Sequence, residues 1–362
     1  MRHAWIEGRP VELRAACAEA ARLLERSRLP VVAGLGTDVA GARAAVRLAQ
    51  RLGAVVDHMH SEALLHDLDV IRDAGMMTTT PTEARLRADV LLLAGELPDD
   101  AWPQFFSAKP DAGDRRIIWL CPGRAARRGA VPNGKVQAVG RGSDALPAVL
   151  AAVRAAVAGH PIGSAPVGAR TLSAVVAQLK AARFGTAVWA AMSLDALAIE
   201  MLCGLVKDLN AHTRFSGLSL PPGDNAPGVL QVCGWMSGLP PRTGFGRGFA
   251  EHDPWRLDAR RLVESGEADC VLWISAYRPC APPWRRDVPT IALTADGASF
   301  PYPPRVHLAV GRPAVDHDAA EYLPAAATLA WAAAAAPRDT VRVADALAEI
   351  AAALNSADAR SC

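Results

Sequence analysis

The sequence predicts an α/β protein with largely parallel sheets. Short runs of β-branched or apolar residues alternate with stretches of helical periodicity along the whole chain. This alternation is typical of βαβ units, in which each helix connects two parallel strands. The chain has 362 residues, of which 51% are hydrophobic, so it can bury a large core and is long enough for two lobes.

The first half of the chain shows the alternation clearly. Apolar residues recur at helical spacing in four segments, and short apolar runs lie between them. The pattern predicts helices over 11–26, 41–52, 82–87 and 144–158, and strands over 30–33, 54–57, 90–94, 117–121 and 136–139. Residues 161–168, rich in Pro, Gly and Ser, are typical of a linker.

The second half repeats the rhythm around one long irregular segment. Helices are predicted over 172–182, 194–210, 258–265, 325–336 and 341–355, and strands over 186–190, 270–274, 290–292 and 306–309. Residues 216–255 are rich in Gly, Pro, Arg and aromatic residues and are predicted to form a loop. A loop of this length is usually functional or packs on a partner, and its lack of a titratable pair favours an interface.

Charge and cysteine content exclude several classes of protein. The chain carries 39 basic and 37 acidic residues without a Lys/Arg run, so no nucleic acid or membrane partner is expected. Seven cysteines occur without a CxxC pair, which indicates a reducing compartment. The N-terminus lacks a signal-peptide pattern, and 325–336 is too short to cross a bilayer. A cytoplasmic protein is predicted.

Two local patterns suggest ligand sites. Gly34-Leu35-Gly36 follows a predicted strand and could hold a phosphate, but its spacing differs from the dinucleotide fingerprint and is typical of a tight βα turn. His58 and His60 directly follow another strand, where alternate side chains point the same way and could bind one zinc ion. A zinc hydrolase using this pair is therefore one hypothesis, and solvated loop histidines are the other.

Several motifs together resemble the B subunit of formylmethanofuran dehydrogenase, which belongs to the molybdopterin oxidoreductases of the formate dehydrogenase type. The resemblance extends over about residues 6–310 through loose motifs. They are Glu-Gly-Arg-Pro (7–10), Leu-Pro-Val-Val-Ala-Gly-Leu (29–35), Ala-Asp-Val-Leu-Leu-Leu-Ala-Gly-Glu-Leu-Pro (88–98), Gly-Asp-Asn-Ala-Pro-Gly (223–228), Gly-Trp-Met-Ser-Gly-Leu-Pro (234–240), Gly-Phe (248–249) and Gly-Glu-Ala-Asp (266–269).

The resemblance implies two interleaved Rossmann-like lobes of the molybdopterin oxidoreductase type. The first would comprise residues 1–57 plus 166–362 and the second 58–165, without the family's iron–sulfur domain. The metal-ligating Cys of the family corresponds to Leu65, which precedes His66-Asp67 and has no donor atom. The resemblance thus implies that metal, molybdopterin and cluster are lost and that no residue is catalytic. It leaves Leu65, His66, Asn225 and Trp235 as candidates for a vestigial pocket.

This pattern of loss is similar to the B subunits of bacterial formyltransferase/hydrolase complexes of methylotrophs. That similarity implies a non-redox structural subunit in a complex that converts formyl-tetrahydromethanopterin to formate through a methanofuran-like carrier. Its partners would be amidohydrolase-like, formyltransferase-like and glutamate-synthase-like subunits, and the carrier could also touch this chain. An active molybdenum or tungsten dehydrogenase, whose pterin dithiolenes hold the metal without Cys, is an alternative.

Overall fold

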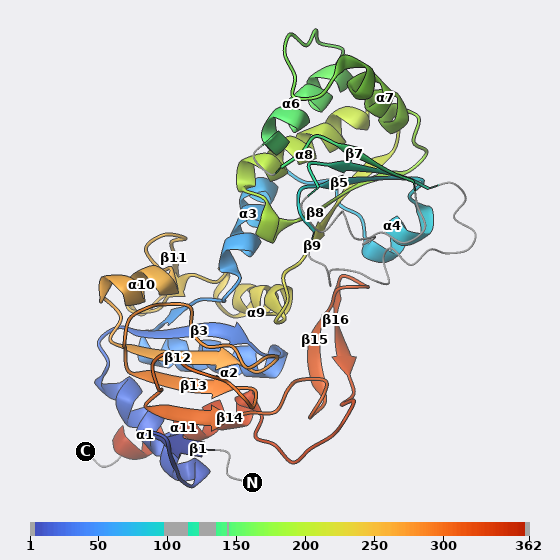
Figure 1. The fold of residues 1–362 in the computed structure, drawn as a ribbon. Coiled ribbons are helices and arrows are strands. Elements are labelled where there is room, and N and C mark those ends of the chain that lie inside the picture. The colour runs from blue at the N-terminus through green and yellow to red at the C-terminus, as the bar shows by residue number, and fades with distance from the viewer. Residues whose placement is uncertain (1–3, 98–114, 123–134, 143–144, 359–362) are drawn as a thin grey trace. The chain divides into compact units, whose positions relative to one another are not determined.

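Contacts within the chain divide it into two α/β units. A computed structural model describes residues 4–97, 115–122, 135–142 and 145–358 (Figure 1). Unit 1 contains Met1–Ser61, Gly223–Tyr322 and Leu329–Cys362, and unit 2 contains Glu62–Pro222 and Leu323–Thr328. The parallel sheets in both units agree with the predicted fold class.

The boundary between the two units differs from the predicted boundary where the chain returns from the second unit to the first. Residues 166–222 were expected in the first lobe, but the structure places them in unit 2. The reason is strand pairing, because β8 (Gly185–Ala190) is the parallel neighbour of β5 (Val90–Ala94), and β9 (Phe215–Leu220) pairs with β8. The chain therefore leaves the second unit only after β9.

Unit 1 is built on a nine-stranded sheet of order β11-β10-β4-β3-β12-β13-β14-β1-β2, with parallel pairing from β4 to β14. Its strands are β1 (Ala4–Ile6), β2 (Arg9–Pro10), β3 (Pro30–Gly36), β4 (Val55–Val56), β10 (Thr243–Gly244), β11 (Glu251–His252), β12 (Cys270–Ser275), β13 (Thr290–Thr294) and β14 (Val306–Ala309). Its helices are α1 (Leu13–Arg26), α2 (Val39–Leu52), α9 (Ala226–Ser237), α10 (Ala259–Ser265) and α11 (Val343–Asp358).

Helices cover both faces of this sheet because alternate residues of each strand point to opposite sides. Val32 and Leu35 of β3 join the apolar cluster that α1, α2, α9 and α11 also line. Val31 and Ala33 of the same strand join the cluster that includes residues of α10. The strand is buried on both faces, which is why it is a continuous apolar run rather than an alternating one.

Unit 2 contains a five-stranded parallel sheet of order β7-β6-β5-β8-β9. Its further elements are α3 (Ser61–Asp73), α4 (Pro81–Arg87), β6 (Arg116–Leu120), β7 (Lys135–Val139), α6 (Leu146–Val157), α7 (Ala169–Lys180) and α8 (Ala196–Leu209). Alternate residues of β5 separate again, since Leu92 joins the cluster with α6, α7 and α8 while Leu91 and Leu93 join the cluster with α4. Asp144, the predicted start of helix 144–158, lies outside the described residues.

Two predicted elements are wrong. The Ala-rich segment 325–336, predicted as a helix, instead contains β16 (Thr328–Ala332), which forms a two-stranded sheet with β15 (Ala319–Leu323). A turn closed by Ala326 N–H on the carbonyl of Leu323 separates the strands, and tertiary context here overrides the helix propensity of alanine. The predicted loop 216–255 contains β9, α9, β10 and β11.

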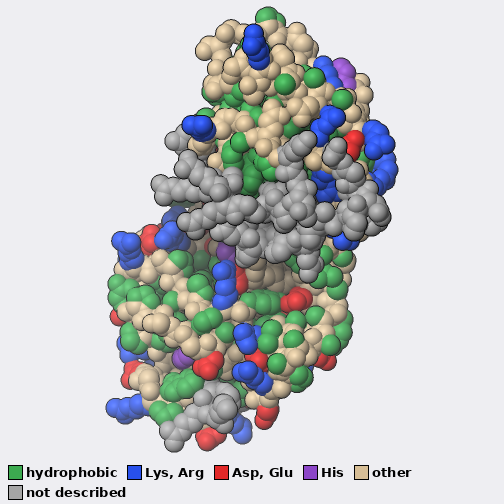
Figure 2. All heavy atoms as spheres, turned by 45° about the vertical axis from the view of Figure 1, so that its right-hand side comes forward, with side chains coloured by type: hydrophobic (Ala, Val, Ile, Leu, Met, Phe, Trp, Pro, Cys, Tyr) green, Lys and Arg blue, Asp and Glu red, His purple; other side chains and the backbone are tan. Residues whose placement is uncertain are grey.

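One face of the molecule carries charges of both signs. In the lower part of Figure 2, Lys and Arg side chains are interspersed with Asp and Glu, whereas the upper part shows mainly Lys and Arg. Among the described residues, no helix is long and apolar enough to cross a membrane.

The close approach of β3 to β12 depends on a glycine. Gly34 has a φ of +80°, and a Cβ added there would lie 2.5 Å from the carbonyl oxygen of Ile274 in β12. Gly8 has a similar φ of +74°, but no atom lies within 4 Å of its added Cβ. Comparing alanine substitutions at these two glycines therefore separates the cost of steric overlap from the cost of the backbone conformation.

We expect Gly34→Ala to destabilise unit 1 far more than Gly8→Ala. The control substitution should cost only the left-handed backbone strain of about 1–2 kcal/mol. Gly34→Ala adds displacement of a strand backbone, so a total loss above about 3 kcal/mol is expected. Urea unfolding of the two variants checks this. Equal losses would show that β3 and β12 can separate freely at this point.

Candidate functional site

A polar cluster lies at the carboxyl edge of the unit 1 sheet, where the strand order reverses. From β3 the chain passes to β4 on one side, while β12 pairs on the other side of β3. In open parallel sheets of this kind, ligands bind outside the carboxyl ends of the strands at such a reversal. We therefore take this edge as the candidate functional site.

Backbone hydrogen bonds hold the strand ends together at this edge. Ala276 N–H, just after β12, donates to the carbonyl of Gly36 at 2.7 Å, and Met59 N–H donates to the carbonyl of Gly34 at 2.9 Å. These bonds fix the segments that carry Arg278 and His60. The turn between β9 and α9 adds Asp224 and Asn225, whose φ values of +55° and +57° lie in the left-handed region.

Asp224 is the centre of the cluster. Its side chain is only 2% exposed, and its carboxylate accepts hydrogen bonds from Nε of Arg278 at 3.0 Å, from Nη2 of the same arginine, and from His60 Nε2 at 3.0 Å. Burial alone would raise the pKa of Asp224, but the hydrogen bonds from His60 and Arg278 lower it to about 2. The carboxylate is therefore ionised at neutral pH.

His58 is fully engaged by its neighbours and stays neutral. Its Nδ1 accepts from the backbone N–H of His60 at 3.0 Å, so the proton must sit on Nε2, which donates to the carbonyl of Asp224 at 3.2 Å. Burial, followed by the nearby His60, lowers the pKa of His58 to about 3. The imidazole thus works as a neutral hydrogen-bonding bridge.

This arrangement does not support the zinc hydrolase hypothesis. Both ring nitrogens of His58 are committed to backbone groups, so no lone pair is available for a metal ion. Nε2 of His60 faces Asp224 and Arg278. Within the part of the chain that the structure describes, no group of three or more His, Cys, Asp or Glu side chains could hold a metal.

Two of the four expected pocket residues, Asn225 and Trp235, lie in unit 1 at α9. Asn225 immediately precedes the helix, where its Nδ2 donates to the carbonyl of Thr37 at 2.8 Å and its Oδ1 accepts from Tyr322 N–H at 2.8 Å. It therefore clamps the end of β3 to β15. Trp235 lies further along the helix, about 15 Å away by the helical rise, and is 62% exposed. The structure does not bring these two residues together.

The other two expected residues, Leu65 and His66, lie in unit 2 on α3. Leu65 is buried and apolar. His66 Nδ1 lies 3.0 Å from the carbonyl of Leu194, and its Nε2 is 3.6 Å from Glu62 one turn earlier. The next residue, Asp67, accepts hydrogen bonds from Trp189 Nε1 at 3.2 Å and Ser219 Oγ at 2.6 Å. Burial raises the pKa of Asp67. These contacts tie α3 to the unit 2 sheet.

Sequence reasoning missed two members of the cluster, Asp224 and Arg278. Asp224 lies in a motif of the family resemblance and in the segment 216–255 expected to form an interface, but it was not singled out as a site residue, and neither was Arg278. Arg278 comes three residues after β12 ends, and a charged residue just beyond a buried parallel strand is a usable signal. The remaining information, that these residues meet His60, comes only from the fold.

Cysteine chemistry is not favoured either. Burial raises the pKa of Cys233 and of Cys270 to about 12, and that of Cys203 to about 12 as well. Such thiols are protonated at neutral pH and are weak nucleophiles.

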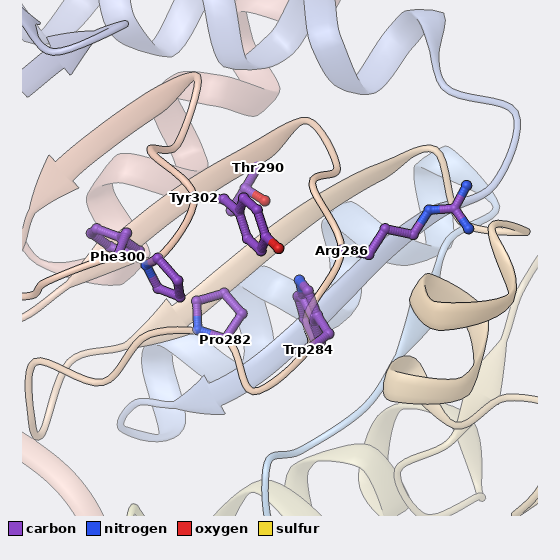
Figure 3. Close-up of a pocket in the computed structure, with 7 residues that line it drawn as sticks. Pro282, Trp284, Arg286, Thr290, Phe300 and Tyr302 are labelled. Carbon is purple, nitrogen blue, oxygen red and sulfur yellow. The ribbon is translucent and has the colours of Figure 1, made fainter.

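A shallow hollow in unit 1 is lined by the two connections that flank β13 (Figure 3). The hollow is open to solvent and has a volume of about 270 Å³, which includes part of the solvent at its mouth. Trp284 on its wall packs edge-on against Trp273, with ring centroids 5.5 Å apart, and Tyr302 donates to the carbonyl of Arg285 at 3.0 Å. The polar groups here serve the packing of the loops, so we assign the hollow no ligand.

The buried His58 predicts a distinctive pH dependence. Folded His58 stays neutral down to about pH 3, whereas in the unfolded chain it takes up a proton near 6.5. The unfolded state therefore binds more protons between these values, and stability falls as pH decreases through 6.5. Between about pH 7 and about pH 5, the titration of His58 lowers the free energy of unfolding by about 2 kcal/mol.

We expect His58→Gln, which cannot titrate, to be less stable than the parent near neutral pH, with the gap narrowing by about 2 kcal/mol near pH 5. Denaturant unfolding across this pH range measures the gap. His212→Gln, at an exposed position, is the control and should show no comparable change. Asp57 is buried next to His58 and is present in both the parent and the variant, so its own titration contributes to the stability of both proteins. A gap that stays constant or widens at acidic pH would contradict a buried neutral His58.

Comparison with known proteins identifies relatives over most of the chain. No protein-family model matches it. The B subunit of the formyltransferase/hydrolase complex Fhc of Methylorubrum extorquens is 35% identical over 304 residues, covering 82% of this chain and 80% of the relative. The B subunit of tungsten-containing formylmethanofuran dehydrogenase 2 is 28% identical in Methanocaldococcus jannaschii and 27% identical in Methanococcus maripaludis. Both matches cover 74% of this chain and 64% of the relative.

A solved structure supports the same relationship. One chain of the crystal structure of the formyltransferase/hydrolase complex FhcABCD from Methylorubrum extorquens with methylofuran matches with a TM-score of 0.87 and 33% identity. The match covers 98% of this chain and 99% of that one. The chain therefore belongs to the family formed by the B subunits of formyltransferase/hydrolase complexes.

Proposed function

We propose that this chain is a non-redox structural subunit of a formyltransferase/hydrolase complex. The complex would convert formyl-tetrahydromethanopterin to formate through a methanofuran-like carrier in one-carbon oxidation. The partners would be amidohydrolase-like, formyltransferase-like and glutamate-synthase-like subunits, which would carry out the chemistry. The observation that carries this proposal is the match of nearly the whole chain to one chain of the FhcABCD structure.

We further assign the two units to the Rossmann-like lobes of the molybdopterin oxidoreductase type. The strand reversal in each parallel sheet supports this, with β3 flanked by β4 and β12, and β5 flanked by β6 and β8. The absence of a CxxC pair from the sequence supports the loss of the cluster. The six cysteines within the described residues are free thiols, which supports a reducing, cytoplasmic location.

The residues do not fit a molybdenum or tungsten pterin held through a protein thiolate. The counterpart of the family's metal ligand is Leu65, a buried aliphatic side chain without a donor atom. His66, the next residue, contacts the carbonyl of Leu194 and Glu62. No step of the proposed function therefore requires a metal or pterin bound to this chain. The dehydrogenase alternative is supported less, since the tungsten relatives share 27–28% identity over 64% of their length.

Exposed aromatic residues support a docking role for the segment between β9 and α10. Trp235 on α9 is 62% exposed, and Phe249 and Trp255 are 58% and 70% exposed. Large exposed aromatic side chains in one segment are typical of subunit contacts, where each contributes strongly once buried. We propose that this segment contacts a partner protein of the complex.

Co-purification tests this proposal. The tagged full chain, expressed with the other subunits of its complex, should retain amidohydrolase-like and formyltransferase-like subunits identified by mass spectrometry. Trp235→Ala combined with Trp255→Ala should lower the recovery of partners by at least about tenfold without lowering the melting temperature of the chain. Leu197→Ala, at a position that is 61% exposed in unit 2, is the matched control. A chain that purifies alone under these conditions would refute a subunit role.

Metal analysis tests the non-redox assignment. Cells supplied with molybdate and tungstate should yield a complex with neither metal in stoichiometric amount at this chain, and without formate-dependent dye reduction. We expect Leu65→Cys to leave both results unchanged, because a thiolate alone supplies neither pterin nor electron path. Stoichiometric molybdenum or tungsten in the parent protein would overturn the assignment.

A further inference from the structure

We propose that the carboxyl edge of the unit 1 sheet is an oxyanion-binding position that the chain fills with its own Asp224 carboxylate. The edge keeps the position where parallel sheets of this order receive anionic ligands. Here an internal carboxylate occupies it, so the native chain takes no external phosphate or carboxylate there. His60, Asp224 and Arg278 all lie in unit 1.

The donors around Asp224 are those of an anion site. Nε and Nη2 of Arg278 both reach the carboxylate, and His60 Nε2 adds a third donor at 3.0 Å. A guanidinium that presents two donors matches the geometry of a carboxylate or phosphate. The side chains of Asp224 and His60 are 2% and 15% exposed, so the carboxylate lies away from bulk water, whereas the Arg278 side chain is 57% exposed.

The backbone holds the carboxylate in this position. Asp224 has a φ of +55°, which is a strained conformation for a residue with a Cβ. Gly36 at the end of β3 packs close to it, since a Cβ added at Gly36 would lie 3.5 Å from Cβ of Asp224, an ordinary van der Waals distance. His58 Nε2 donates to the carbonyl of Asp224, so the turn is fixed independently of the side chain.

Electrostatics explain why the native site excludes other anions. The ionised Asp224 already neutralises Arg278, and a second anion at the same donors would lie next to a buried carboxylate. Removing only the carboxylate removes the negative charge that excludes other anions. The donors of Arg278 and His60 that contacted Asp224 would then face the empty position of the carboxylate. A small oxyanion of similar size should occupy that position.

Anion rescue of a glycine variant tests the proposal. Asp224→Gly removes the carboxylate without backbone strain, because glycine accepts positive φ, and it keeps the carbonyl that His58 contacts. In the full chain we expect the melting temperature to fall by roughly 8 °C. Formate, acetate or inorganic phosphate at about 100 mM should restore roughly 3 °C of this, whereas chloride at equal ionic strength should not.

Matched variants keep the test decisive. The parent and Asp224→Asn, whose amide still fills the position and tolerates positive φ, should show no oxyanion-specific stabilisation. Arg278→Met in the Asp224→Gly background should abolish the rescue. If Asp224→Gly is too unstable for a thermal scan, equilibrium dialysis of inorganic phosphate against the same variant below its melting temperature replaces the thermal readout, with binding at least about tenfold tighter than to the parent expected. An oxyanion response of Asp224→Gly no larger than that of the parent, or phosphate binding by the parent as tight as by the variant, would overturn the proposal.

Discussion

The buried carboxylate of Asp224 is the interaction on which the candidate site depends. One side chain ties together the segment after β4, through His60, and the segment after β12, through Arg278. Its own backbone carbonyl receives His58, so both halves of the residue are used. Burying a charge is costly unless it is paired and hydrogen-bonded, and here both conditions are met. Asn225 extends the same anchoring to the ends of β3 and β15.

Much of the fold could be predicted from the sequence because buried parallel strands are continuous apolar runs. Strand 90–94 was predicted with its observed bounds, and strands 186–190 and 270–274 to within one residue. Errors occurred where local signals are weak or misleading. The helix α9 begins after two residues with positive φ and contains Pro and Gly, so its sequence is typical of a loop. The Ala-rich segment 325–336 has helical propensity, but the turn before Thr328 makes it a strand.

The site was less accessible to sequence reasoning. His58 and His60 were identified as a pair, and zinc binding was the natural hypothesis for that spacing. Their real partners lie far away in the chain, Asp224 at 164 residues and Arg278 at 218 residues from His60. No local pattern encodes such a meeting. Likewise, the expected pocket of Leu65, His66, Asn225 and Trp235 combined residues from two separate units, and only strand pairing shows where each unit ends.

The interleaving of the units has a consequence for the order in which they form during synthesis. Nearly all of unit 2 is one continuous stretch from Glu62 to Pro222, so its sheet can assemble while the ribosome is still translating the remainder. The sheet of unit 1 cannot assemble at that stage, because β3 pairs with β12 and β1 pairs with β14, and both partners are synthesised later. Until β12 emerges, the backbone N–H and C=O groups along one edge of β3 have no partner strand. The first segment of unit 1 therefore stays without its partner strands until the whole of Glu62–Pro222 in unit 2 has been synthesised.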